Sequence, residues 1–141
     1  MRIARSNLTW LALALLAGSA AARSSMTPAL YVQCQTAAHL ATLTGMEERL
    51  ALARRAAAAD ELRRADEKAR ARVDRAYASC GSSVGALGAY AYRNDEQIRA
   101  WLAANPTPKA LLESLQARIA GVGAQLGGAP RTGIVRQPRQ P

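Results

Sequence analysis

Residues 44–81 read TGMEERLALARRAAAADELRRADEKARARVDRAYASCG, and this stretch decides the fold. From Glu47 to Cys80 it has no proline or glycine, and its commonest residues, Ala, Arg, Glu and Leu, lose little side-chain entropy in a helix. Thr44 and Glu47 have the spacing of a capping box, and Gly81 is a typical C-terminal stop. The stretch predicts one long, highly charged helix of about 34 residues, ~50 Å in length.

One narrow apolar stripe follows this predicted helix at steps of 3.6 residues. It runs through Leu62, Ala65, Ala69, Val73, Ala76 or Tyr77, and Cys80. Because the stripe is mostly alanine, it has little area to bury, and a neighbouring helix must approach its backbone closely. The sequence therefore predicts an all-α fold, either a small helical bundle or a helical hairpin, built on the long charged helix.

Shorter elements flank this helix. Thr27-Pro28 supplies an N-cap and a first-turn proline for a helix that we expect to end near Leu43. The segment 82–92 is compatible with a short helix or an ordered loop. Asn94, with Gln97 three residues on, predicts the start of a short amphipathic helix that ends at Asn105, before a proline.

A last helix is predicted to begin at Thr107-Pro108. It has the strongest apolar seam in the chain, formed by Leu112, Leu115, Ile119, Val122 and Leu126. Tyr77 and Trp101 are the large residues that we expect in the core.

The N-terminus has the pattern of a secretory signal peptide. Arg2 and Arg5 precede an apolar run, and Ala20 and Ala22 satisfy the small-residue rule for cleavage after residue 22. Removal of 22 of the 141 residues would leave 119 and would lower the formal charge from +9 to +7. We therefore expect a cleaved signal peptide (1–22), a single helical domain (23–126), a disordered basic tail (127–141), and a periplasmic or secreted protein.

The two cysteines, Cys34 and Cys80, predict a disulfide bond in an exported protein. Two buried thiols or an intermolecular bridge are the alternatives. In a straight hairpin that turns near Gly45, the two cysteines would lie ~36 Å apart along the helix axes, a distance that a disulfide cannot span. The pairing thus predicts a bend or break in the long helix between Ala57 and Lys68, with Asp66 as a candidate cap.

No constellation of residues specifies chemistry. His39 is the only histidine, so a site with several histidine ligands is excluded, and a solitary histidine on a helix is typical of a structural residue. The paired acidic residues are explained by helix starts and ion pairs. We expect neither a catalytic site nor a metal or other cofactor, and hence a non-enzymatic protein.

The arginines of the long stretch project around most of the helix rather than along one edge, which argues against nucleic-acid binding. The leading hypothesis is an exported helical interaction protein of the bacterial cell envelope, an adaptor, chaperone-like factor or inhibitor that binds a protein partner or itself. One alternative is an electrostatic binder of the membrane surface or of cell-wall polymer.

A second alternative comes from the layout of the chain. An N-terminal apolar segment, a charged exported helix and two cysteines together resemble the layout of inner-membrane spanins of phage lysis systems. The resemblance covers layout only, without a shared motif. It implies a membrane-anchored lysis protein if residues 1–22 are retained.

The predicted partner surface lies early in the long helix. It comprises Leu50, Leu52, Arg54, Arg55 and Ala56. Together with the neighbouring alanines these residues offer more apolar surface than one short preceding helix can cover, so coiled-coil-like self-association or a partner helix is expected here.

Overall fold

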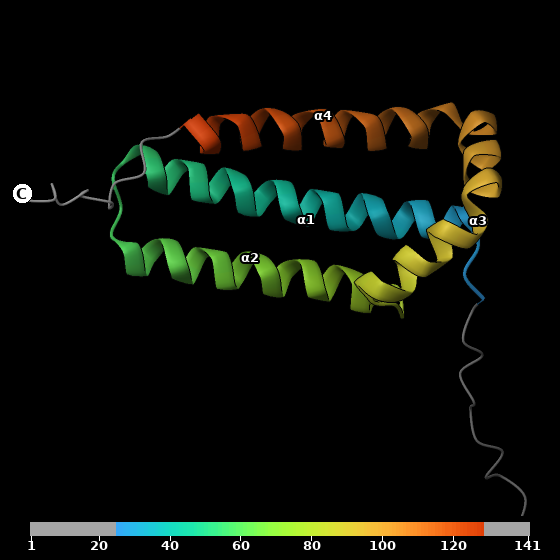
Figure 1. Cartoon of the computed structure of the whole chain (residues 1–141), viewed down its shortest axis with the longest axis horizontal. Coiled ribbons are helices and arrows are strands. Elements are labelled where there is room, and N and C mark those ends of the chain that lie inside the picture. The colour runs from blue at the N-terminus through green and yellow to red at the C-terminus, as the bar shows by residue number, and fades with distance from the viewer. Residues whose placement is uncertain (1–24, 129–141) are drawn as a thin grey trace, which may run out of the picture.

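The computed structural model describes residues 25–128, which form four helices. They are α1 (Pro28–Arg54), α2 (Ala59–Ser79), α3 (Val84–Ala104) and α4 (Pro106–Gly128). Figure 1 shows α4, α1 and α2 running alongside one another with α1 in the middle, while α3 crosses one end. The predicted all-α bundle is confirmed. The predicted signal peptide lies outside the described residues, as does the predicted tail except for Gly127 and Gly128, which extend α4.

Helix α1 begins where the sequence predicts and ends much later. The Thr27 Oγ1 accepts a hydrogen bond from the Leu30 amide at 3.2 Å, which caps the first turn. The helix then continues through the expected end near Leu43 to Arg54. The Thr44 hydroxyl donates to the Leu40 carbonyl at 2.9 Å, a bond within the helix. The predicted helix start at Thr44 is therefore wrong.

Gly45 explains why the helix continues. It is buried in α1, and a Cβ atom at this position would lie 2.5 Å from the Cβ of Ala69 on α2. The missing side chain lets the two helices approach closely, as the alanine-rich stripe of α2 requires. The sequence pattern predicts Gly45 at the start of a helix, but the structure uses it for a contact between two helices. Tertiary packing here overrides local propensity.

The predicted break in the long stretch is present but begins earlier than expected. Residues 55–58 interrupt the helix, with Ala56 at a φ of 53°, in the left-handed region. The expected range began at Ala57, so the two overlap only at its edge. Asp66 is not a cap: it lies inside α2 and pairs with Arg49 of α1.

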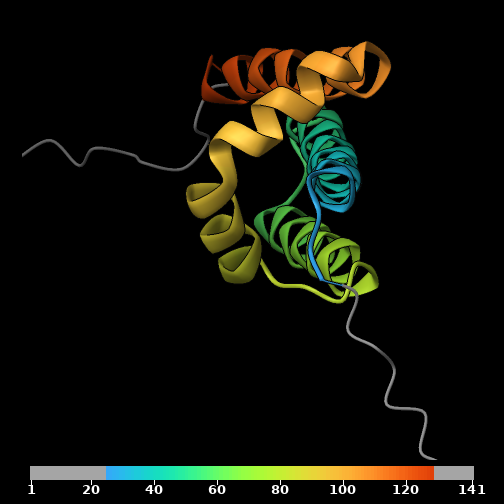
Figure 2. The ribbon, with the colours of Figure 1, turned by 90° about the vertical axis from the view of Figure 1, so that its right-hand side faces the viewer.

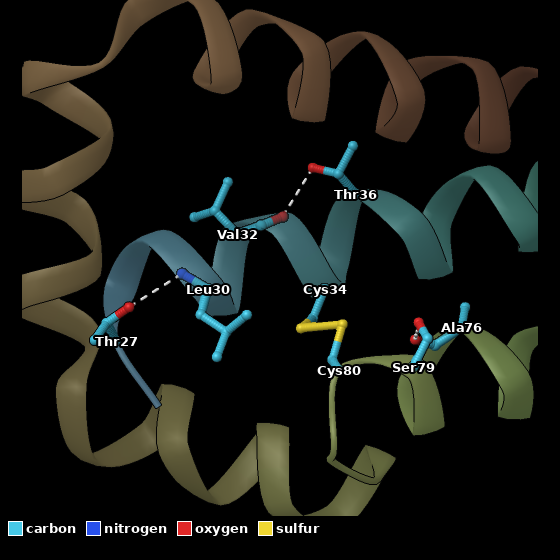
Figure 3. Close-up of a disulfide and its surroundings, with 8 residues drawn as sticks. All are labelled: Thr27, Leu30, Val32, Cys34, Thr36, Ala76, Ser79 and Cys80. Carbon is cyan, nitrogen blue, oxygen red and sulfur yellow. Dashed lines mark hydrogen bonds between the residues drawn. A yellow bond between two sulfur atoms is a disulfide. The ribbon is translucent and has the colours of Figure 1, made fainter. Parts of the chain in front are cut away.

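The cysteines form an internal disulfide, as predicted. Their Cα atoms are 6.0 Å apart, and Figure 3 shows the bridge between α1 and the end of α2. Cys34 lies ~31 Å before the turn at residues 55–58, and Cys80 lies ~33 Å after it. Because the two cysteines lie at nearly equal distances from this turn, they come opposite each other. The turn thus resolves the conflict between a straight long helix and the disulfide.

Segment 82–92, which the sequence left open, is the first half of α3. The Ser83 hydroxyl caps it by accepting from the Ala86 amide at 3.2 Å. At Asn94 the backbone leaves helical geometry, and the side-chain amide donates to the Tyr90 carbonyl at 2.9 Å. The helix predicted to start at Asn94 is thus the second half of a kinked helix. Figure 2 shows α3 arching from the end of α2 to the start of α4.

The core is small and belongs mainly to α1. Nine apolar residues are buried within residues 25–128, six of them on α1: Val32, Cys34, Ala38, Ala41, Leu43, Leu50, Leu87, Ile98 and Leu115. The predicted aromatic core residues Tyr77 and Trp101 are only half-buried. Small and aliphatic side chains fill the interior instead.

Helix α4 starts at Pro106, slightly before the predicted Thr107 cap. Its predicted apolar seam is confirmed: Leu115 is buried and the other four members are half-buried, on a helix that packs against α1. Among the helices that the structure describes, none combines the length and the apolar character needed to cross a membrane.

Candidate functional site

A groove runs between α1 and α2, at the end of the bundle where residues 55–58 join them. Its lining consists of three apolar residues and of four charged residues with long aliphatic stems, and its volume is about 430 Å³, open to solvent rather than enclosed. We call it the basic-rimmed groove. It is lined by Glu48, Ala51, Leu52 and Arg55 of α1 and by Arg64, Ala65 and Lys68 of α2.

The floor of the groove follows from the close packing of α1 on α2. We call its three apolar lining residues, Ala51, Leu52 and Ala65, the floor, and two of these three side chains are single methyl groups. The contact between Gly45 and Ala69 holds the helix backbones close together on the side of the groove away from the turn. A floor of small side chains between two closely packed helices is shaped for the ridge of a further helix.

The charges around the groove are unequal. Glu48 accepts two hydrogen bonds from the guanidinium of Arg72, at 2.9 and 3.4 Å, so its charge is compensated. Arg55 pairs with Glu61 across the turn at 2.6 Å. Arg64 and Lys68 are exposed, one helical turn apart, and within residues 25–128 neither has an ion-pair partner. The local field in the groove therefore favours anionic groups.

The structure brings only part of the predicted partner surface to this groove. Leu52 and Arg55 line it. Leu50 is only 8% exposed and belongs to the core, so its predicted exposure is wrong. Arg54 turns toward α4 and donates to the Gln125 side chain at 2.6 Å. Ala56 is exposed in the turn but does not line the groove.

Three lining residues, Arg64, Ala65 and Lys68, are absent from the predicted surface. Ala65 belongs to the apolar stripe that was recognised in the sequence, and Arg64 and Lys68 have the i,i+4 spacing of neighbours on a helix. Their approach to Leu52 depends on where the chain turns. A predicted break between Ala57 and Lys68 did not place them there.

A second groove lies near the other end of the bundle. We call it the uncharged groove, because none of its lining residues is charged: Ala29, Val32, Gln33, Thr36, Ala37, Leu40, Trp101, Pro108 and Leu111. Leu40 and Leu111 are 53% and 51% exposed. This groove therefore offers an apolar surface that resembles the first groove in size but lacks its charges.

His39 is half-buried on α1. Burial lowers the pKa of its imidazole by desolvation, which favours the neutral ring at neutral pH. Its Nδ1 is buried without a hydrogen-bond partner, so no serine or carboxylate orients the ring through this atom. Within the part of the chain that the structure describes, no three His, Cys, Asp or Glu side chains gather in a group that could hold a metal ion.

Ion pairs join α1 to both of its long neighbours. Glu47 pairs with Arg118 of α4 at 2.9 Å, whereas Glu48 and Arg49 pair with Arg72 and Asp66 of α2. Of these residues only Glu48 lines the groove, and its pairing with Arg72 leaves Arg64 and Lys68 as the uncompensated charges of the lining.

No protein-family model matches this chain, and neither a curated protein nor a solved structure matches it.

Proposed function

We propose that this chain is a non-enzymatic interaction protein of the extracytoplasmic cell envelope, which binds another protein in the basic-rimmed groove. The observation that carries the proposal is the apolar floor formed by Ala51, Leu52 and Ala65, open to solvent and flanked by cations without partners. A solvent-open groove with apolar lining and charged edges is suited to receive the apolar face of a partner helix. An adaptor, a chaperone-like factor and an inhibitor all fit this description.

Two features support the extracytoplasmic location. The Cys34–Cys80 disulfide is compatible with an oxidising compartment. The first 22 residues have the sequence pattern of a signal peptide, with a charged start, an apolar run and small residues before the expected cleavage point. Both point to the periplasm or the exterior.

Electrostatic binding to the membrane surface or to wall polymer is the second candidate. It is favoured by a set of exposed basic residues that have no ion-pair partner within residues 25–128. These are Arg54, which bonds the neutral Gln125 side chain, and Arg64, Lys68, Arg70, Arg75 and Arg93. Binding of this kind would be screened by salt, because exposed charges lose most of their attraction beyond a Debye length.

Cross-linking in the intact envelope, followed by purification of the chain and mass spectrometry, tests the proposal. Leu52→Glu places a charge on the groove floor and should abolish the cross-linked product. Leu111→Glu places the same charge on a leucine of the uncharged groove and should leave the product intact. Circular dichroism of both variants should match the parent, since neither leucine is fully buried.

A product that Leu111→Glu removes and Leu52→Glu spares would overturn the proposal. Equal products from all three chains, lost as ionic strength rises, would favour the electrostatic candidate instead. An apolar contact in the groove predicts a product that survives high salt, because burial of apolar surface is not screened by ions.

A further inference from the structure

We infer that the element received by the basic-rimmed groove is an acidic amphipathic helix of the partner protein, about two turns of which make contact. This inference rests on the proposed function. It adds the chemical class of the bound element.

The floor fits a helix. Its α1 residues extend from Glu48 to Arg55, which is ~10 Å along the helix axis, or about two turns. Ala51 and Ala65 present methyl groups only, so an incoming helix can approach the α1 and α2 backbones closely. Leu52 is the one larger side chain on the floor and supplies a contact for the apolar face of that helix. Laying an apolar helix face into such a groove is a recurring mode of recognition.

The cations set the charge of the partner. Arg64 and Lys68 lie at i and i+4 on α2, so their charged groups follow one edge of the groove at the repeat of a helical turn. Glu48 adds little opposing charge, because Arg72 holds it. A partner helix with carboxylates one turn apart, beside its apolar face, would pair with both cations at once.

The same charges exclude two other occupants. A second copy of this chain, docked through the same groove, would bring the same uncompensated cations and no free carboxylate, since the one acidic lining residue, Glu48, is held by Arg72. The segment that follows Gly128 contains Arg131, Arg136 and Arg139 and no acidic residue, so it carries the wrong sign. An anionic partner is the occupant that the charges favour.

Peptide binding tests the inference. The probe is a fluorescent peptide of about 18 residues, long enough to be helical in water, with Leu and Ala on one face and Glu beside it. Two control peptides keep the apolar face and carry Gln or Lys in place of Glu. For the protein isolated from the envelope, fluorescence anisotropy should show the Glu peptide binding about 10-fold more tightly than the Gln peptide, with the Lys peptide weakest.

Variants of the rim complete the test. Arg64→Gln with Lys68→Gln should reduce the preference for the Glu peptide over the Gln peptide to about 1-fold. Arg70→Gln with Arg75→Gln is the matched control. It removes two cations of the same helix that do not line the groove, and the 10-fold preference should remain. Because all four residues are exposed, both double variants should keep the fold.

Equal affinity for the Glu and Gln peptides overturns the inference. The proposed function is still supported in that case if Leu52→Glu abolishes the cross-linked product. Displacement of the Glu peptide by phosphatidylglycerol vesicles, with tighter binding to the vesicles, also overturns it in favour of a lipid surface. A third outcome also overturns the inference: the control double variant loses the preference for the Glu peptide as fully as the rim variant does. The preference would then come from the net charge of the protein.

Discussion

Gly45 is the residue whose role differs most from its local sequence signal. A glycine after a threonine suggests a break before a helix, yet here it lies inside α1 at its contact with α2. The Ala69 methyl group fills the space that a side chain at residue 45 would need. Single atoms at this crossing therefore set the distance between the two helices.

Gly45→Ala should lower the free energy of unfolding by about 1–3 kcal/mol, because the new methyl group would overlap that of Ala69. Gly121→Ala is the control. Gly121 is exposed on α4 with no atom within 4 Å of its Cβ position, so the change should raise stability by about 0.5–1 kcal/mol through helix propensity. Urea unfolding of both variants measures the difference.

The test of mechanism is a double-mutant cycle. In an Ala69→Gly background the space is free, so Gly45→Ala should cost far less than in the parent. An equal cost in both backgrounds would show that the two residues do not compete for space.

His39 should make stability depend on pH. Burial lowers its pKa in the folded protein, so the unfolded chain takes up a proton more readily. The free energy of unfolding should therefore be constant above about pH 6.5, fall as the pH drops below the unfolded value, and level off below the folded pKa.

Chemical denaturation between about pH 7 and pH 5 measures this effect, above the range in which carboxylates usually titrate. His39→Gln removes the titrating group and should flatten the profile, since His39 is the only histidine in the chain. A parent profile that matches the variant would mean that the imidazole keeps its usual pKa.

At the scale of elements, the disulfide and the turn at residues 55–58 depend on each other. The turn makes the arms of the α1–α2 hairpin nearly equal in length, and the bridge fixes their register at the far end. Helix α2 has no fully buried residue of its own, so half-buried packing against α1, such as Ala69 against Gly45, holds it in place together with this tie and the ion pairs to α1. The groove near the turn depends on the same register.

Replacing both cysteines by alanine should lower the free energy of unfolding by about 4 kcal/mol in the chain-entropy estimate. Because Cys34 is fully buried, alanine is preferred to serine, which would bury a hydroxyl group. Urea denaturation of the double variant against the oxidised parent measures the change. A difference below about 1 kcal/mol would mean that the bridge contributes little to stability.

At the scale of the whole molecule, α1 is the centre of the bundle. It contacts the three other helices and contributes six of the nine buried apolar residues in the described range. Each half of α3 and the seam of α4 contribute single buried residues, and α2 contributes none. Stability should therefore be distributed unevenly.

Hydrogen exchange followed by mass spectrometry should show this gradient. We expect the slowest exchange between Val32 and Leu50 of α1, and faster exchange in the first half of α2, which lies far from the disulfide. Reduction of the disulfide should accelerate exchange in α2 more than in α4. Uniform protection across all four helices would contradict this picture.

The sequence by itself determined the helical class, the start of α1, the seam of α4, the cysteine pairing and the existence of a break in the charged stretch. The helical features depend on local propensity and apolar periodicity, which are properties of neighbouring residues. The break follows instead from the two cysteines, because a disulfide cannot join them across a straight hairpin. Within the candidate site, the sequence identified Leu52 and Arg55, because apolar and basic residues beside an alanine run are visible without a fold.

Only the tertiary structure decided the position of the turn, the place of Gly45 inside α1 and the burial of Leu50. It also brought Arg64, Ala65 and Lys68 to the side of Leu52. Each of these depends on the register of α1 against α2, that is, on which residues of the two helices lie opposite each other. Two contacts between residues distant in the sequence fix this register: the Cys34–Cys80 bridge and the close approach of Gly45 to Ala69. Local patterns carry no information about such contacts, because the energy that selects them is gained only when the helices meet.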